Sequence, residues 1–215
     1  NALWYNALKI MESFANLYKE KELAKKYAEL AKKCKESFIK KFYNKKRKCF
    51  DDLVGDNSIR PNQLFAIGLH YPVVEPNSVE AKTAFETVTK KLLTPYGLKT
   101  LAKGEEGYTE IYEGSPYKRD MSYHQGITWP WLLGLYYDGL KNLIIMERDR
   151  RTREELEGKL KGFVEKTRIT FDAEMRQRSS IDTISEIYDS CRPYEERGAF
   201  AQAWSVAEIF RIIAQ

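Results

Sequence analysis

Four segments of this 215-residue sequence combine amides, basic groups, carboxylates and flat aromatic rings. They are 56–63 (DNSIRPNQ), 122–131 (SYHQGITWPW), 184–189 (ISEIYD) and 198–205 (GAFAQAWS). Amide, guanidinium and imidazole groups hydrogen-bond hydroxyl groups, and aromatic faces pack on the apolar side of a sugar ring. This mixture therefore favours a site for a hydroxyl-rich ligand.

The segment 56–63 has a structural interpretation that explains only part of it. A capped helix start with a proline in its first turn accounts for the residues around Pro61. It does not account for Arg60, Asn62 and Gln63, which together would offer a fork of hydrogen-bond donors to hydroxyl groups. We predict that these three residues bind the ligand.

The segment 122–131 places His124 and Gln125 shortly before Trp129 and Trp131. A lone histidine is more often structural than functional, and tryptophans that flank a proline at a helix start often belong to the core. Imidazole and amide groups beside tryptophan are nevertheless the combination that sugar sites use. We predict that all four side chains contact the ligand.

Glu186 lies between two isoleucines in an otherwise apolar stretch. A carboxylate in that setting is either a buried structural acceptor or a catalytic group. Asp182 and Asp189, which lie nearby, fit roles in turns and caps. Gln202 follows in a segment of small residues that allows close backbone approach, so we predict that Gln202 and Glu186 share one cleft with the other candidates.

Apolar residues at steps of three and four predict seven helices. The expected helices cover about 4–18, 23–42, a short stretch after 61, 78–92, 130–144, 156–171 and 200–215. Short strand-like ribbons are expected only at 48–53 and 108–112. The sequence therefore predicts an all-α fold.

The connections between these helices alternate between short and long. The long ones are 43–59, 94–128 and 179–199, and they hold most of the candidate residues. Alternate connections of antiparallel helices lie at opposite ends of a bundle, so the long loops should meet at one end. Loops longer than about 12–15 residues in a compact domain are usually functional. No internal repeat of about 33–47 residues is visible, which favours a helical toroid over an open solenoid.

Composition argues against several classes of function. The net charge of +5 is spread over solvated helix faces such as 19–41, which is not typical of a nucleic-acid binder. Three cysteines without CxxC spacing indicate reduced thiols in the cytoplasm. Two isolated histidines predict no metal site, and the absence of an apolar run of about 18 residues predicts no membrane span. We expect no cofactor, and no signal peptide is visible at Asn1.

Five blocks, in order along the chain, carry a family resemblance. They are NALWYNAL at 1–8, SIRPNQ at 58–63, YHQGITWPW at 123–131, ISEIYD at 184–189 and AQAWSVAE at 201–208. Together they resemble the C-terminal amylo-α-1,6-glucosidase domain of glycogen debranching enzymes. The resemblance implies a glucoamylase-like (α/α)6 barrel and inverting hydrolysis of α-1,6-linked glucose on glycogen. It also implies that Glu186 is the general base, whereas the acid is an aspartate in a loop ahead of the first block.

The expected protein is therefore the C-terminal portion of one catalytic domain, residues 1–215, with about seven helices of a partial (α/α)6 toroid. The acid-bearing loop and the N-terminal helices would lie upstream of Asn1. The expected partners are an α-glucan such as glycogen or limit dextrin, the missing part of the domain, and a second copy through an exposed apolar edge. Two alternatives stay open: a non-catalytic glucan- or partner-binding helical domain, and another (α/α) toroid glycosidase.

Overall fold

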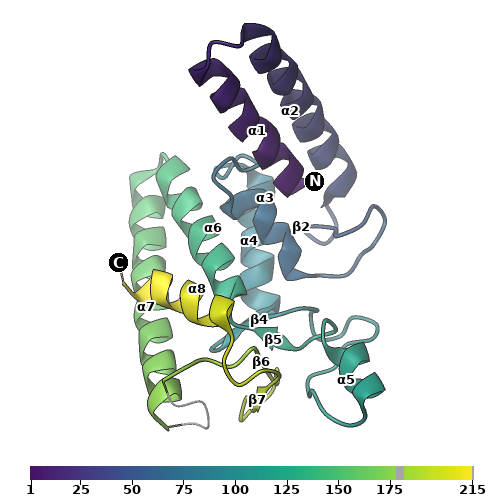
Figure 1. Cartoon of the computed structure of the whole chain (residues 1–215), viewed down its shortest axis with the longest axis vertical. Helices are drawn as coiled ribbons and strands as arrows, with labels where there is room; N and C mark the ends of the chain where they lie inside the picture. The colour runs from purple at the N-terminus through teal and green to yellow at the C-terminus, as the bar shows by residue number, and fades with distance from the viewer. Residues whose placement is uncertain (178–181, 215) are drawn as a thin grey trace.

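The computed structural model describes residues 1–177 and 182–214 and consists mainly of helices (Figure 1). The helices are α1 (Ala2–Leu17), α2 (Lys21–Phe42), η1 (Pro61–Leu64, a 3₁₀-helix), α3 (Phe65–Gly68), α4 (Val79–Lys91), α5 (Pro116–Ser122), α6 (Leu132–Met146), α7 (Arg150–Gln177) and α8 (Ala203–Ile213). The strands are β1 (Tyr43–Asn44), β2 (Cys49–Phe50), β3 (Leu93–Thr94), β4 (Gly97–Lys99), β5 (Thr128–Trp129), β6 (Ile187–Tyr188) and β7 (Glu196–Arg197). Among the described helices none is both long and apolar enough to cross a membrane.

The predicted all-α fold is confirmed in part: each of the seven expected segments contains a helix, but a small sheet is also present. Capping explains several of the boundaries. The Ser78 hydroxyl accepts a hydrogen bond from the Ala81 amide at the start of α4, and Pro61 opens η1. The last helix begins at Ala203, later than expected, because the Gln202 amide still donates to the Ile184 carbonyl. Residues 179–181 of the third long loop and residue 215 of the last expected helix lie outside the described residues.

Two features of the structure correct the predicted secondary structure. The helix α5 was not expected, although the Ser115 hydroxyl caps it and Pro116 opens it. An antiparallel sheet with the strand order β3-β4-β5-β6-β7 was not expected either. The predicted ribbon at 108–112 is wrong, because the Thr109 amide bonds the Gln125 carbonyl in a loop without strand pairing. The other ribbon is confirmed in part, since Cys49–Phe50 pairs with Tyr43–Asn44.

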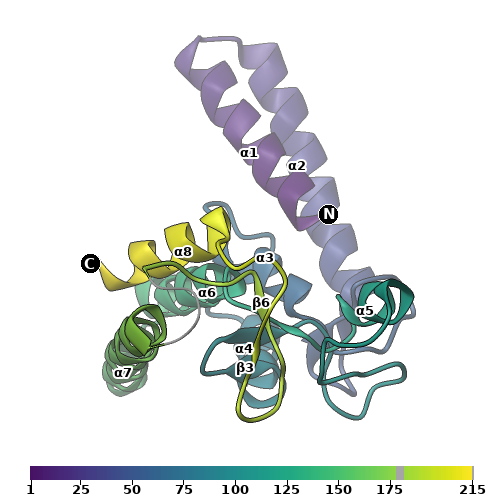
Figure 2. The ribbon, with the colours of Figure 1, turned by 60° about the horizontal axis from the view of Figure 1, so that its bottom comes forward.

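The three long connections meet at one end, as predicted. The Ala102 amide donates to the Ile59 carbonyl at 3.0 Å, which joins the second loop to the first. The Ser190 amide donates to the Glu110 carbonyl at 2.8 Å, which joins the third loop to the second. Figure 1 shows α5 and β4 to β7 at the bottom of the molecule, opposite the turn between α1 and α2. Figure 2 brings this lower end forward.

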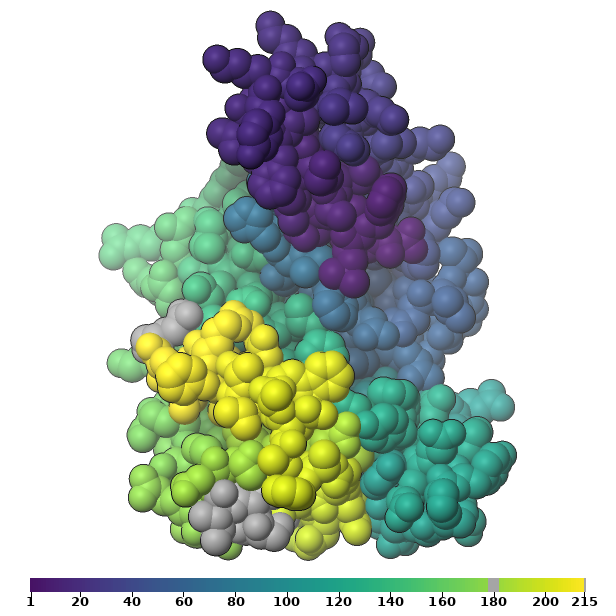
Figure 3. Space-filling view, in the orientation of Figure 1, coloured from purple at the N-terminus to yellow at the C-terminus, as the bar shows by residue number. Residues whose placement is uncertain are grey.

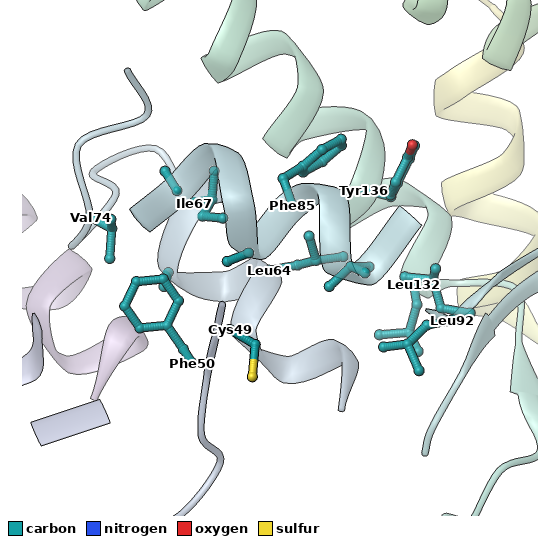
Figure 4. Close-up of a cluster of buried hydrophobic side chains, with 14 of the residues drawn as sticks. Cys49, Phe50, Leu64, Ile67, Val74, Phe85, Leu92, Leu132 and Tyr136 are labelled. Carbon is teal, nitrogen blue, oxygen red and sulfur yellow. The ribbon is translucent and has the colours of Figure 1, made fainter. Parts of the chain in front are cut away.

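A buried core holds η1 and α3 beneath these loops (Figure 4). Leu64 and Ile67 are fully buried, and Phe85 and Leu132 pack in the same cluster. Full burial of one such side chain stabilises the fold by about 1.5–3 kcal/mol. Gly68 lets α3 approach α6, because a Cβ atom there would lie 2.9 Å from the Leu135 carbonyl oxygen. The core therefore fixes the element that follows Arg60.

Two helices carry exposed apolar faces. The α1 face consists of Leu3, Trp4, Met11, Phe14 and Leu17. The α8 face consists of Trp204, Val206 and Phe210, and the exposed Phe200 lies just before this helix. Figure 3 shows that α1 and α8 lie on the same side of the molecule, and that the hairpin of α1 and α2 projects from the rest.

Two glycine substitutions should change the free energy of unfolding in opposite directions. A Cβ atom at Gly97 would lie 2.3 Å from the Trp129 carbonyl oxygen, so we expect Gly97→Ala to destabilise the fold by about 1–3 kcal/mol. Gly158 lies within α7, where a Cβ atom meets nothing within 4 Å, so Gly158→Ala should stabilise by about 0.5–1 kcal/mol. Urea unfolding followed by circular dichroism measures both. A neutral Gly97→Ala variant would contradict the close pairing of β4 and β5.

Candidate active site

One pocket of about 410 Å³ at the loop end gathers most of the predicted binding residues. Its lining combines three tryptophans, one imidazole, one guanidinium, one carboxylate and two amides. These residues are Asp52, Arg60, Asn62, His124, Gln125, Trp129, Trp131 and Trp204. We call it the inner pocket.

Arg60 ties the inner pocket together. Its Nη1 donates to the carbonyl oxygens of His124 at 2.9 Å and Thr100 at 3.2 Å, and its Nη2 donates to Gln125 Oε1 at 2.9 Å. All of these acceptors belong to the second long loop or its neighbouring strand. Because the guanidinium is planar and its donors have fixed directions, Arg60 sets the position of the loop that carries His124.

Stacked rings form one wall of the inner pocket. His124 lies parallel to Trp129, with ring centroids 5.2 Å apart and an interplanar angle of 13°. Trp204 stacks on Trp131 at 5.3 Å and meets Trp129 edge-on at 5.8 Å. Burial lowers the pKa of His124, and the nearby Arg60 lowers it further, so the imidazole is neutral near pH 7. A neutral imidazole both donates and accepts hydrogen bonds, which suits a hydroxyl group.

Asp52 is a pocket residue that the sequence analysis missed. Its Oδ2 accepts a hydrogen bond from Asn62 Nδ2 at 2.7 Å, so the predicted residue Asn62 orients it. Burial raises the pKa of the Asp52 carboxyl, while Asn62 and Arg60 oppose that rise. The Asp51–Asp52 pair in the first long loop was the available signal, but acidic pairs in loops usually belong to turns.

Glu186 does not line the inner pocket but is connected to it. Its Oε1 accepts hydrogen bonds from Tyr123 Oη at 2.5 Å and Gln202 Nε2 at 3.3 Å. Its Oε2 accepts one from the Ala199 amide at 3.0 Å. The Tyr123 ring lies 4.8 Å from that of Trp129, so one residue joins the carboxylate to the aromatic wall. Tyr123 was not among the predicted site residues.

A glycine makes the Ala199 contact available. Gly198 has a φ of +70°, and a Cβ atom there would lie 2.3 Å from Glu186 Oε2. The Glu186 amide in turn donates to the Ala199 carbonyl at 2.9 Å. Burial raises the pKa of Tyr123, and its hydrogen bond to Glu186 raises it further, so the phenol remains a donor. The backbone and two side chains thus hold Glu186 in one orientation.

Two predicted binding residues lie elsewhere. Gln63 is 4% exposed and does not line the inner pocket. Its Oε1 accepts from the Phe50 amide at 3.2 Å and its Nε2 donates to the Arg60 carbonyl at 2.8 Å, so it joins β2 to η1. These bonds give Gln63 a structural role, and its predicted contact with a ligand stays a prediction. Gln202 lies beside Glu186, not in the pocket lining.

The arrangement offers an uncharged ligand many hydrogen bonds and a flat apolar wall. In the described part of the chain, no group of three or more His, Cys, Asp and Glu side chains is placed to hold a metal ion. A carboxylate has about four acceptor sites, and protein donors fill three of those on Glu186. The remaining site is on Oε2, where a water molecule can donate a hydrogen bond to it.

The pKa of His124 provides a direct test of the inner pocket. We expect the imidazole to titrate below 6.5 in NMR spectra, and Arg60→Gln to raise its pKa by removing the positive charge. Arg150→Gln, on the exposed surface of α7, is the matched control and should change nothing. An unchanged pKa in Arg60→Gln would mean that Arg60 does not act on His124.

Comparisons with known proteins concern the fold and the family of this chain. A solved structure described as a sialidase has a similar fold, with a TM-score of 0.72 and 14% sequence identity over 98% of this chain. The chain spans only 19% of the length of that protein, and at this identity the likeness concerns the fold alone. The family model for amylo-alpha-1,6-glucosidase matches residues 1–211. That match covers nearly the whole sequence and confirms the resemblance of its five blocks: the chain belongs to the amylo-alpha-1,6-glucosidase family.

Proposed function

We propose that this chain is part of a glycoside hydrolase domain that releases α-1,6-linked glucose from a glucan with inversion, and that Glu186 is its general base. The family match supports a glycosidase of this kind. The observation that carries the proposal is the position of Glu186, held by three donors and joined through Tyr123 to an aromatic pocket.

Inverting hydrolysis needs a carboxylate that removes a proton from water and a carboxylic acid that protonates the leaving oxygen. The two groups lie about 6.5–9.5 Å apart, so that water fits between the base and the anomeric carbon. Glu186 meets the requirements for the base, because hydrogen bonds orient it and Oε2 keeps one acceptor site for water. In the inner pocket, the aromatic wall would pack on the glucose ring while His124 and Asp52 bond its hydroxyls. Trp129 is 3% exposed and supports this wall from behind.

We propose that the general acid belongs to a segment that precedes α1. Long loops precede η1, α6 and α8 at the site end, and by the same alternation a long loop would precede α1. Asn1 lines a small neighbouring pocket that shares Asp52 and Asn62 with the inner pocket. Chain entering α1 would therefore arrive beside the substrate.

The apolar faces of α1 and α8 support a larger helical assembly. Contiguous apolar surface of this kind usually marks a contact with other protein. We propose that the chain is one part of an (α/α)6 toroid, and that further helices of the same domain cover both faces.

The pocket favours a neutral sugar over an acidic one. Sialidases, by their name, act on sialic acid, which carries a carboxylate. In the described part of this chain, Arg60 is the guanidinium that lines the inner pocket, and it bonds Thr100, His124 and Gln125. Among the described residues, no other cationic side chain lines this pocket, so we do not propose sialidase activity.

A substitution of the proposed base tests the reaction. In a protein that contains this chain and the proposed acid-bearing segment, Glu186→Gln should lower kcat by about 10²- to 10⁴-fold. Oligosaccharide binding should remain, because the amide keeps the shape of the carboxylate. NMR should show β-glucose as the first product of the unsubstituted protein, since the reaction inverts the α-linkage.

The control is Glu157→Gln on the exposed surface of α7, which should be fully active. The 215-residue chain alone should bind sugar without turnover. An active Glu186→Gln protein, or strong hydrolysis by the chain alone, would show that the base or the acid is wrongly assigned. Sugar binding without turnover in the longer protein would favour the non-catalytic alternative.

The exposed apolar faces give a separate prediction. We expect the 215-residue chain alone to self-associate in sedimentation velocity, and Phe14→Glu with Phe210→Glu to shift it to the monomer. Ile169→Glu, at an exposed apolar position on α7, is the control and should not change the association. A chain that stays monomeric at all concentrations would count against the proposal that other protein covers the apolar faces of α1 and α8.

A further inference from the structure

A second and larger cavity adjoins the inner pocket. Its volume is about 800 Å³, against about 410 Å³ for the inner pocket, and Arg60 and Gln125 line both. The cavity lies between the segment 56–60, the loop 105–113 and α5. We call it the α5 groove. The two cavities are therefore neighbours, and they meet at the hydrogen-bonded pair of Arg60 and Gln125.

The lining of the α5 groove is acidic. Asp56, Glu105, Glu106 and Glu113 face one lysine, Lys118, and the shared Arg60. Asp56 accepts hydrogen bonds from Ser58, and Glu105 is paired with Arg47, so these two carboxylates help to build the walls. An anionic ligand is repelled by such a surface, whereas hydroxyl groups donate hydrogen bonds to carboxylates.

The groove also carries exposed apolar side chains. Tyr117 is 73% exposed, and Met121 lies one helical turn further along α5. Ile111 faces the same cavity from the loop. Flat and apolar surface beside hydroxyl-accepting groups suits a pyranose, which has an apolar C–H face and a hydroxyl rim. The α5 groove thus repeats the combination of apolar surface and hydroxyl-accepting groups that lines the inner pocket.

We infer that the α5 groove binds the glucan chain on the leaving side of the scissile bond, with Tyr117 as a stacking platform for one glucose unit. The inference rests on the proposed function, which places the released glucose in the inner pocket. Bound in this way, the linear α-1,4-linked chain lies against α5 while its branch reaches past Arg60. The volume of the groove lies within the roughly 300–1,000 Å³ typical of ligand pockets.

NMR titration of the labelled 215-residue chain with two sugars tests the inference. Maltotriose represents the linear chain, and 1-deoxynojirimycin is a glucose-sized probe for the inner pocket. Maltotriose should shift the backbone signals of residues 105–121, whereas the small probe should shift those of His124 and Trp129. Tyr117→Ala should weaken maltotriose binding about three- to tenfold, the worth of one aromatic contact, and leave the small probe unaffected.

Tyr18→Ala is the matched control, because Tyr18 is 75% exposed at the far end of α1. It should bind both sugars as the unsubstituted chain does. If maltotriose shifts only the signals of the inner pocket, or binds Tyr117→Ala with unchanged affinity, the inference about the α5 groove is wrong. The proposed function is then unaffected. If maltotriose shifts 105–121 while the small probe binds nowhere, the groove is supported and the proposed function fails. If neither sugar binds, both fail.

Discussion

The pairing of Thr128 in β5 with Tyr188 in β6 joins two loops that are far apart in the sequence. Around it lies a buried polar cluster: the hydroxyls of Thr128 and Ser190 are 2.7 Å apart, and Ser190 Oγ also donates to the Gly126 carbonyl. Buried polar groups are costly unless they are paired, so these bonds hold the two loops in one arrangement. The distance between Glu186 and the aromatic wall depends on this arrangement.

The register of the pairing decides which side chains reach the site. Successive residues in a strand point to opposite faces, so Thr128 enters the polar cluster while Trp129 turns toward the inner pocket. In the partner strand β6, the Tyr188 hydroxyl donates to the buried Glu174. Glu186 lies just before this strand and accepts a hydrogen bond from Tyr123. A slip of one residue would exchange the two faces. Short strands thus position the site more than the long helices do.

The long helices were predictable because each has enough residues to show a period of three and four. The sheet was not, since a strand of two or three residues is too short to alternate visibly and its partners are set by tertiary contacts. Tertiary contacts also decide the different positions of Gln63 and Asn62, two neighbouring amide side chains that the sequence does not distinguish. One amide happens to reach the Phe50 amide and is buried, whereas the other faces Asp52 in the pocket.

Glu186 and the aromatic blocks were recognisable from residue type, but the network that serves them was not. Tyr123 and the Ala199 amide matter because Gly198 and the sheet bring them to the carboxylate. A backbone amide has no sequence signature of its own. Only the small residues in 198–205 hinted at a close approach, without indicating what would approach.

The positive charge of Arg60 contributes to the electrostatics of the inner pocket. Its charge stabilises carbonyl groups of the wall, and it also disfavours a second positive charge on His124. Because the pKa of His124 is lowered in the folded state, the unfolded chain binds its proton more readily. This group therefore contributes stability above the unfolded pKa, near 6.5, and the contribution is lost as the pH falls through the lower folded value. Above that range the imidazole is uncharged and can both donate and accept hydrogen bonds, which suits a neutral sugar whose hydroxyls do the same.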